Sequence, residues 1–409
     1  MGRRPRELAG LFRRGDKPSY SPHIVLECEE KNRHILLMDI WQTPAWPRFR
    51  HDATATEGPL ADFSARLGSI KGLQAALSAD ERRETFLRAV TSEAVASFAI
   101  EGAALRAEDI EASVVASLTR RGAEPQRRSD AIATLMLDAR AGQGALSDER
   151  LFHWHRLLFH GVDLEDKGGW RSFPIVIVRG ATAGREEVLY AAPPPDRVAV
   201  MMQEFLSSLE SDGRPVSIRA ALAHLWFESI HPFSDGNGRI GRALVEYVFA
   251  KDAALPFSLS RQIEADKQGY YRALQAGRTV SGDHIDATPF VLWFLERLTA
   301  GIIEAEAEAR FLVARNGFFL RFPSLPARGE KVLRRLFAEG PRRLSEGISA
   351  GPYAKIAGVS LATATRDLGE LEASGAILRG REGGRSTRYM LHLAMERNDQ
   401  GQLGMPDGF

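Results

Sequence analysis

His231-Pro232-Phe233-Ser234-Asp235-Gly236-Asn237-Gly238-Arg239-Ile240-Gly241-Arg242 lies between two stretches of helical periodicity. We therefore expect a loop that leads into the N-terminus of a helix. Two glycines flank an asparagine within it, and both residue types tolerate positive φ angles. Such a turn lets successive backbone N–H groups converge on an anion, and the helix that follows adds the positive end of its dipole. The segment thus predicts an anion site.

The charged side chains of this segment indicate which anion it would bind. Arg239 and Arg242 carry permanent positive charge and forked donors that suit phosphate oxygens. Asp235 is a hard oxygen ligand, suited to a Mg²⁺ ion that bridges phosphates. His231 titrates near neutral pH and can take a proton from a hydroxyl group. Together these residues predict the transfer of a phosphate-containing group to a hydroxyl.

The segment resembles the Fic family motif, His-x-Phe-x-Asp/Glu-Gly-Asn-Gly-Arg-x-x-Arg, at every fixed position. Most Fic proteins transfer AMP from ATP to a hydroxyl side chain of a target protein. The resemblance implies ATP as substrate, Mg²⁺ as cofactor, and a protein target with a Ser, Thr or Tyr hydroxyl, which could be the chain itself. It also implies a role for each motif residue: His231 as general base, Phe233 as core anchor, Asp235 as Mg²⁺ ligand, Gly236, Asn237 and Gly238 as ligands of the α- and β-phosphates, and Arg239 and Arg242 as ligands of the β- and γ-phosphates.

A β-rich stretch interrupts the helical pattern. Residues 174–178 read Pro-Ile-Val-Ile-Val between glycines, and Val188-Leu189-Tyr190 follows after a glycine-containing loop, so we expect a β-hairpin. The resemblance implies that this hairpin is the family's flap. The flap holds the backbone of the target as an added strand, here through Ile175, Val176 and Ile177. The resemblance further implies that the adenine-side wall comes from Tyr270 and Tyr271.

A second motif lies upstream of the loop. Ser97-Phe98-Ala99-Ile100-Glu101-Gly102 resembles the family's inhibitory motif, Ser/Thr-x-x-x-Glu-Gly/Asn. Ser97 and Glu101 share one helical face next to an apolar stripe, so the carboxylate should be partly buried and should need a partner. Arg242 is the natural candidate, and an arginine held in this way cannot bind the γ-phosphate of ATP. The motif predicts autoinhibition within the chain, by a helix over residues 79–102. Ser78 followed by Glu81 predicts a capping box at the start of this helix, and Val90, Ala94 and Phe98 recur at spacing four as its apolar stripe.

Other interpretations of these motifs stay open. Glu101 could merely cap the end of its helix with Gly102 behind it. The same carboxylate could instead position a water for the reverse reaction, the removal of AMP. The loop could carry a different group, since a few Fic relatives transfer phosphocholine, UMP or phosphate. A DNA-binding regulator whose Fic domain only senses nucleotide is a further hypothesis.

Periodicity and composition predict a mainly α-helical chain in five segments. These are an uncertain extension (1–37), an N-terminal helical module (38–120), a Fic core with a hairpin flap (121–312), a winged helix-turn-helix domain (323–392) and a loose tail (393–409). Helical patterns lie near 107–118, 126–141, 147–160, 195–210, 215–229, 238–252, 262–276 and 286–312. The Trp-Gln-x-x-x-Trp-Pro-x-Phe stretch that starts at Trp41 resembles the leading module of some bacterial Fic proteins.

The winged-helix prediction rests on the order of elements and on charge. A short helix at 353–357, a turn at Gly358, a second helix at 361–374 and two strands follow one another. Residues 321–397 carry 14 Lys or Arg against 8 Asp or Glu, while the formal charge of the whole chain is only +1. We expect contacts with DNA, or alternatively with protein in a homodimer, from Ser360, Thr363, Thr365, Arg366, Arg379, Arg381, Arg385 and Arg388.

Composition bounds the remaining possibilities. The 409 residues are 44% hydrophobic and 26% charged, which excludes collagen-like, disordered and disulfide-stapled classes. Cys28 is the only cysteine, so no internal disulfide is expected. No run of 18 apolar residues and no secretory signal is visible, which predicts a cytoplasmic protein without a membrane partner. The histidines at 153, 155 and 160 lack the spacing of a metal site, so we expect ordinary helix packing there.

Overall fold

The computed structural model describes residues 39–119, 124–179, 187–252, 254–380, 387–393, 396–397 and 403–404. The extension predicted at 1–37 lies outside these residues. The chain forms two compact units. The first contains the chain up to Phe63 together with Glu84–Gly301, and the second contains Ser64–Arg83 together with the chain from Ile302 onward. The first unit therefore combines parts of the predicted N-terminal module and of the predicted Fic core.

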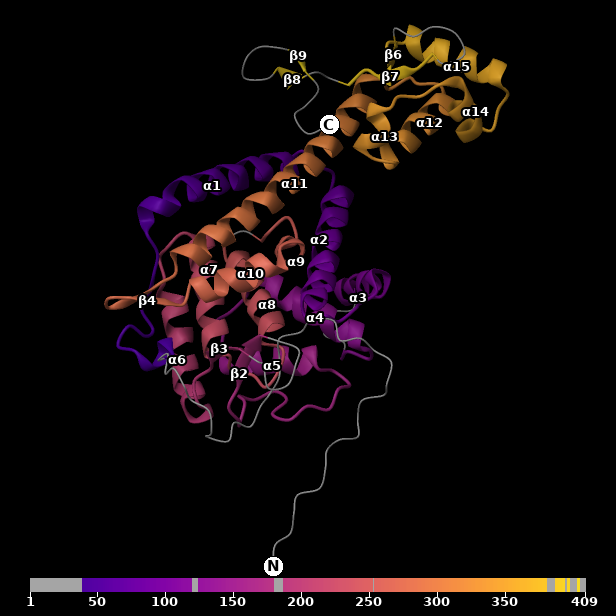
Figure 1. Ribbon diagram of the computed structural model, residues 1–409. Helices are drawn as coiled ribbons and strands as arrows, with labels where there is room; N and C mark the ends of the chain where they lie inside the picture. The colour runs from indigo at the N-terminus through magenta and orange to yellow at the C-terminus, as the bar shows by residue number, and fades with distance from the viewer. Residues whose placement is uncertain are drawn as a thin grey trace, which may run out of the picture. The chain divides into compact units, whose positions relative to one another are not determined.

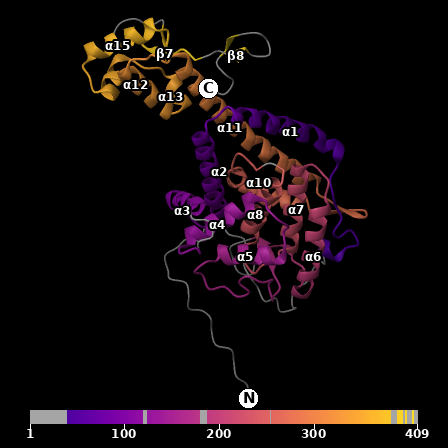
Figure 2. The same ribbon diagram turned by 180° about the vertical axis from the view of Figure 1, so that it is seen from behind.

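The helices of the first unit surround a pair at its centre. α7 (Val216–Ile230) is buried on nearly all sides, and its buried residues include the polar Ser217, His224 and Glu228. α8 (Asn237–Ala250) packs beside it, and α4 (Arg128–Ala141) packs on α8 (Figures 1 and 2). The other helices wholly within this unit are α3 (Ala107–Thr119), α5 (Asp148–Leu158), α6 (Pro195–Ser211), α9 (Leu259–Ala265) and α10 (Lys267–Ala276).

Three further helices have residues in both units. They are α1 (Ala53–Ala75), α2 (Ala79–Ile100) and α11 (Thr288–Arg321). α2 begins with the predicted capping box: the Ser78 hydroxyl accepts from the Glu81 N–H at 3.2 Å, and the Glu81 carboxylate accepts from the Ser78 N–H at 2.7 Å. Its buried stripe includes Val90, Ala94 and Phe98, as the spacing predicts.

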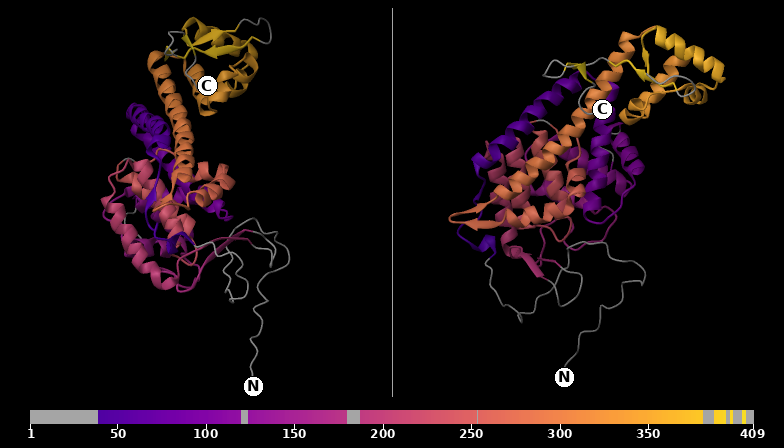
Figure 3. Two further views of the ribbon diagram at one scale, coloured as in Figure 1. Left: turned by 60° about the vertical axis from the view of Figure 1, so that its left-hand side comes forward. Right: turned by 45° about the horizontal axis from the view of Figure 1, so that its top comes forward.

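The strands of the first unit form two small sheets. β2 (Val176–Arg179) and β3 (Glu187–Ala191) make an antiparallel hairpin with Ile177 opposite Tyr190, which confirms the predicted hairpin. β4 (Thr279–Ser281) and β5 (His284–Asp286) form a second hairpin that projects from the helices (Figure 3). The η1 turn (Ile40–Gln42) is followed by β1 (Phe49–Arg50), which pairs with β5 in parallel. The N-terminal segment is thereby joined to the rest of this unit.

Three elements differ from the predicted ones. The single helix predicted at 262–276 is two helices, because the Asp266 side chain accepts from the Gly269 N–H at 3.1 Å and caps a new start. The helix predicted to end at 312 continues to Arg321 as α11. The β4–β5 hairpin was not expected, because strands of three residues leave almost no periodic signal in the sequence.

The second unit contains the helix-turn-helix order that the sequence predicts. α12 (Ala327–Ala338), α13 (Pro341–Ser345), α14 (Ala350–Ala357) and α15 (Leu361–Ala373) precede the antiparallel strands β6 (Ile377–Arg379) and β7 (Tyr389–Leu391). Ile348 also pairs with Tyr389. α12 and α13 were not expected, and the tail predicted to be loose contains paired two-residue strands, β8 (Glu396–Arg397) and β9 (Leu403–Gly404). Strands of two residues are too short to leave a recognisable periodic pattern in the sequence. The buried core of this unit includes Leu333, Phe337, Ile348, Tyr353, Leu368 and Ile377.

No helix within the described ranges is long and apolar enough to cross a membrane.

Candidate active site

The predicted anion loop joins α7 to α8 through two residues with positive φ. His231 follows the end of α7 with φ 52°, and Gly236 precedes α8 with φ 80°. A Cβ at Gly236 would also overlap Leu158 and Phe159, so only glycine fits there. The loop is thus a sharp turn that ends at a helix N-terminus, as the sequence predicts.

Asn237 closes this turn from inside. Its side-chain carbonyl accepts from the Phe233 N–H at 2.9 Å, and its amide donates to the Phe233 carbonyl at 2.8 Å. The side chain is buried and fully used by the loop. A phosphate contact at Asn237 would therefore come from its backbone N–H, since the first N–H groups of a helix have no acceptor within the helix.

A buried arginine holds the turn that carries His231. The Arg171 guanidinium donates to the carbonyl of His231 at 2.8 Å and to that of Phe173 at 3.0 Å, and it also reaches the carbonyl of Pro193. Because Phe173 and Pro193 flank the β2–β3 hairpin, one side chain fixes both the base of the hairpin and the histidine turn. Burial lowers the pKa of Arg171 to about 10, so the guanidinium stays charged at neutral pH. No local pattern in the sequence indicated this role of Arg171.

Glu228 lies beside the imidazole of His231, three residues earlier on α7. Its Oε2 atom is 3.7 Å from Nδ1 of His231, and both side chains are buried. Burial alone would raise the pKa of Glu228, but hydrogen bonding and charge from His231, His224 and Arg278 bring it below the usual value. A carboxylate on the Nδ1 side favours a proton on that nitrogen and leaves Nε2 as the proton acceptor. Glu228 was not identified from the sequence. Its position three residues before His231 on a predicted helix is the feature that could have identified it.

Arg242 is fully buried and is bound by the inhibitory motif. It donates from Nε to the Ser97 hydroxyl at 2.9 Å, and from a terminal nitrogen to the Ser97 carbonyl at 2.7 Å and to Glu101 Oε1 at 2.9 Å. Burial lowers the pKa of Arg242, but the negative charge of Glu101 raises it above its usual value. The carboxylate follows directly after α2 and is only 12% exposed.

Gly238 makes room for this carboxylate. A Cβ at Gly238 would overlap Glu101 Oε1 and would lie 3.0 Å from Arg242. The Glu101 carboxylate therefore lies against the first turn of α8, where the helix dipole and the free N–H groups favour an anion. In this structure, the anion at the start of α8 is therefore the Glu101 carboxylate of the protein itself.

Arg239 is the second motif arginine, and it lies between two aromatic rings. Its guanidinium carbon is 5.2 Å from the ring centre of Phe98 and 5.1 Å from that of Phe159. It also pairs with Asp235 at 3.0 Å. Phe98 belongs to the inhibitory motif, so α2 contacts both motif arginines.

Asp235 has the exposure that a metal ligand needs. Its side chain is 46% exposed, and within the described residues no cluster of three or more His, Cys, Asp or Glu could hold a metal ion. Mg²⁺ commonly takes one or two carboxylates and completes its shell with waters and substrate phosphates. The donor set therefore fits a Mg²⁺ ion that enters with a nucleotide.

His155 supports the loop from α5, a role that the sequence did not indicate. Its Nδ1 accepts from the Gly168 N–H at 2.9 Å, so Nε2 carries the proton and donates to the Asp235 carbonyl at 3.2 Å. The ring stacks on Phe233 at 4.3 Å. Burial lowers the pKa of His155 to about 4, which keeps the ring neutral. His155 packs as expected for a helix residue, and in addition it holds the backbone of the loop.

Comparison with known proteins agrees with this geometry. Residues 145–249 match the model of the Fic/DOC family. The chain carries a Fic domain. Residues 40–119, which include the Trp41 stretch and the inhibitory motif, match a domain of unknown function, DUF4172. The Fic loop and the segment that carries Ser97 and Glu101 therefore belong to two different matched regions.

Curated relatives and a solved structure share the Fic domain. Protein adenylyltransferase Fic of Drosophila willistoni is 34% identical over 106 residues, which are 25% of this chain and 20% of the relative. That of Nematostella vectensis is 31% identical over 120 residues, which are 28% and 26%. The chain thus matches only about a fifth to a quarter of the length of these relatives. The crystal structure of a Fic family protein from Desulfovibrio desulfuricans has a TM-score of 0.52 at 25% identity, covering 85% of this chain and 98% of that chain.

The two tyrosines predicted beside the adenine lie in different surroundings. Tyr270 is only 2% exposed, and its hydroxyl is 2.8 Å from Nε2 of His224. Its ring also packs at a tilt against Trp293, with the ring centres 5.6 Å apart. Tyr270 is therefore a core residue of the first unit. Tyr271 is partly exposed, so of the pair only Tyr271 could contact a nucleotide.

The flap is attached to the N-terminal segment along one edge. The Trp41 indole donates to the Ala191 carbonyl at 2.9 Å, and the Asp39 carboxylate accepts from the Ala191 N–H at 3.2 Å. Ile175 is buried, whereas Val176 and Ile177 are partly exposed. Of the three flap residues predicted to hold a target, only Val176 and Ile177 therefore have side chains that reach the surface, and the carbonyl of Ile175 accepts from the Ala192 N–H at 3.0 Å.

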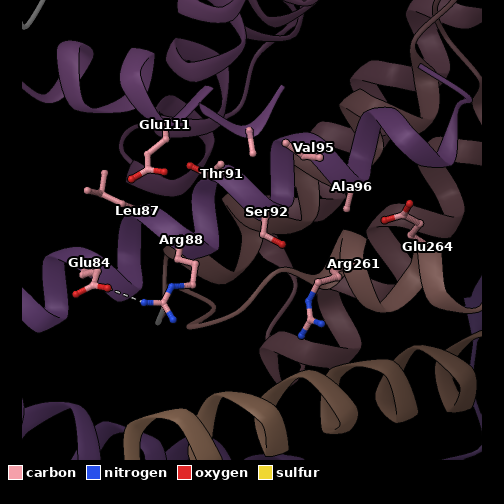
Figure 4. A pocket seen from close by; sticks show the side chains of 11 residues that line it. Glu84, Leu87, Arg88, Thr91, Ser92, Val95, Ala96, Glu111, Arg261 and Glu264 are labelled. Carbon is pink, nitrogen blue, oxygen red and sulfur yellow. Dashed lines mark hydrogen bonds and ion pairs between the residues drawn. The ribbon is translucent and has the colours of Figure 1, made fainter. Parts of the chain in front are cut away.

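A hollow of about 580 Å³ opens on the other flank of α2 (Figure 4). It lies between α2, α3 and α9 and has mixed charges, with Glu84 and Arg88 already paired at 2.8 Å. Glu111, Arg261 and Glu264 complete its charged rim. It contains none of the Fic loop residues, so we assign the active site from the loop and not from this hollow.

Proposed function

We propose that the Fic domain transfers AMP from ATP to a hydroxyl side chain of a target protein, and that Glu101 restrains this activity. One observation carries the proposal: the Glu101 carboxylate lies against Gly238 and on Arg242, at the anion-favouring start of α8. A carboxylate in that place competes with a phosphate for the same donors. The relatives named protein adenylyltransferases support the choice of AMP.

The proposed reaction forms one bond and breaks one. The hydroxyl oxygen of the target attacks the α-phosphorus of ATP, the bond from that phosphorus to the β-phosphate breaks, and pyrophosphate leaves. His231 takes the hydroxyl proton on Nε2. Arg171 fixes the backbone of this histidine, and Glu228 favours the required tautomer. The protein thus supplies a positioned base and a rigid turn.

The polyphosphate would be bound by the Fic loop. The N–H groups at the start of α8 and the guanidinium groups of Arg239 and Arg242 are the available donors. Asp235 would hold Mg²⁺, which when bound neutralises charge on phosphate oxygens. Because Glu101 occupies Arg242, the γ-phosphate would lack this donor until the carboxylate moves away. Restraint and substrate binding therefore compete for one guanidinium.

Labelling with radioactive ATP tests the proposal. We expect Glu101→Gly to raise self-labelling from ATP labelled at the α-phosphate by about 5–150-fold, the usual range for a coupling between two sites. Adding His231→Ala should abolish the gain. The matched control is Glu124→Gly, which removes an exposed loop glutamate. Equal labelling with and without His231 would refute the assignment of the base.

The same assay separates the alternative reactions. ATP labelled at the γ-phosphate would label the protein only if phosphate is transferred, and UTP or CDP-choline would replace ATP if another group is carried. Loss of label from a previously labelled target, dependent on Glu101, would indicate removal of AMP. Label from the α-phosphate alone is the outcome that the proposal requires.

A further inference from the structure

The second compact unit carries a surface that the Fic domain does not explain. Several of its cations are neutralised by ion pairs on α12 and α13: Arg334–Glu330 at 2.7 Å, Arg335–Glu339 at 2.9 Å and Arg343–Glu346 at 3.2 Å. Lys331 and Arg342 of the same two helices are exposed and form no ion pair of this kind within the described residues. Three exposed cations, Lys355, Arg366 and Arg379, have no ion pair of this kind within the described part of this unit.

These three cations come from neighbouring elements. Lys355 lies on α14, Arg366 on α15 and Arg379 on β6, and α15 packs against both of the others. Figure 1 shows these elements together around α15. Uncompensated positive charge on adjacent elements attracts a polyanion.

α15 is held firmly from its inner side. Asp367 is buried and accepts two hydrogen bonds from Arg328, at 3.0 and 2.9 Å, and one from the Tyr353 hydroxyl at 3.1 Å. The only carboxylate in the first two turns of α15 is thus directed into the domain. The outer side of these turns consequently presents Arg366, and the nearest exposed carboxylate on this helix, Glu370, lies one turn further along.

The exposed side of α15 also carries several small residues. Its exposed positions include Ala362, Thr365 and Gly369. A Cβ at Gly369 would meet nothing within 4 Å, so packing within the protein does not require this glycine. Glycine inside a helix is unfavourable by about 1 kcal/mol relative to alanine. A glycine in such a place suits the close approach of another molecule to the helix.

We propose that α15 binds double-stranded DNA, with Lys355, Arg366 and Arg379 contacting phosphates and the face of Ala362, Thr365 and Gly369 entering the major groove. A helix with a slim outer side fits this groove, and cations on both flanks match the two phosphate backbones. A second copy of this chain fits less well, because a symmetric contact would bring Arg366 close to the same cations of the partner. This proposal is independent of the activity of the Fic domain.

Salt titration of binding by the full chain tests the proposal. The probe is a fluorescent duplex of random sequence, and the readout is anisotropy. Three phosphate contacts predict that affinity falls by roughly 40-fold between about 50 and about 200 mM salt. Replacing Lys355, Arg366 and Arg379 together by Gln should remove most of this binding. The matched control replaces Lys331, Arg334 and Arg335 of α12 by Gln, which removes the same charge from exposed positions.

A second variant distinguishes the loss of a DNA contact from a loss of folded protein. Gly369→Leu adds bulk where the protein has open space and replaces a poor helix former, so the melting temperature should stay the same or rise. DNA affinity should nevertheless fall at least tenfold, because the added side chain blocks the helix face.

Three results would overturn the proposal. One is an equal loss of affinity in the α12 control, which would indicate a general attraction without a defined surface. Another is unchanged affinity in Gly369→Leu. The third is the absence of binding to any duplex, together with a change of oligomeric state in the triple variant, which would assign the face to a protein contact.

Discussion

The carboxylate of Glu228 and the imidazole of His231 face each other across the last turn of α7, with Oε2 3.7 Å from Nδ1. We expect Glu228→Gln, in the Glu101→Gly background, to lower kcat by about tenfold or more, since general-base catalysis supplies 10²–10⁴-fold. KM for ATP should change less than kcat, because Glu228 lies beside His231 and acts on Arg242 only through its charge. Steady-state labelling at several ATP concentrations measures both constants.

The control for this variant is Glu246→Gln, which removes another buried carboxylate, paired with Arg140 at 3.0 Å and distant from His231 in sequence. It should leave kcat unchanged. A rise in KM with unchanged kcat in Glu228→Gln would mean that Glu228 acts on nucleotide binding.

Gly238 and Glu101 should be coupled in stability. The methyl group of Gly238→Ala would overlap the carboxylate of Glu101, so we expect a loss of about 1–3 kcal/mol in the free energy of unfolding. In the Glu101→Gly background, Gly238→Ala should lower the free energy of unfolding by a clearly smaller amount. Urea denaturation of the four proteins gives the coupling energy directly. Strictly additive values would contradict the close contact between these residues.

Arg171→Lys should weaken the histidine turn. A lysine has three donors at one point and cannot serve the separate carbonyls that the guanidinium reaches, so about 2–4 kcal/mol of stability should be lost. Labelling in the Glu101→Gly background should fall even at a temperature where the protein is folded. Arg140→Lys is the matched control: it also alters a buried arginine that donates to carbonyls, but labelling should persist once folding is verified by circular dichroism.

His155 should make stability dependent on pH. Its folded-state pKa is about 4, below the usual 6.5, so the unfolded chain binds the extra proton first as the pH falls. Stability should therefore decrease from pH 6.5 down to about 4, by up to about 3 kcal/mol from this group. His155→Gln keeps a donor and an acceptor but does not titrate. The difference in unfolding free energy between the two proteins should shrink toward pH 4, and a constant difference would exclude a titrating role for His155.

Local sequence patterns were sufficient for the Fic loop and for most helices. His231 and Gly236 have the backbone angles that the turn required, and α2 begins at its predicted capping box. The contact of Glu101 with Arg242 bridges 141 positions of sequence, and it was accessible only because the family motif relates the two segments. The division of the 262–276 helix was missed, because a capping aspartate inside a continuous helical pattern is a weak signal.

The supporting residues could not be predicted for a different reason. Arg171 lies 60 positions from the histidine carbonyl that it holds, and His155 lies 80 positions from Asp235. Neither position is marked by periodicity, and a single arginine or histidine in a helical chain is more often a surface or packing residue. Their roles depend on which carbonyls the fold brings near them, which is a property of the tertiary structure.

The attachment of Asp39 and Trp41 to Ala191 determines where the flap can be extended. The leading segment occupies the backbone groups of Ala191 at the end of β3, so along the described residues the edge of β2 is the one that this segment leaves open to a guest strand. If the flap receives substrates, they must arrive as extended peptide. The flap would then accept target proteins whose acceptor hydroxyl lies on a flexible loop or tail, and would exclude those that present it on a rigid helix.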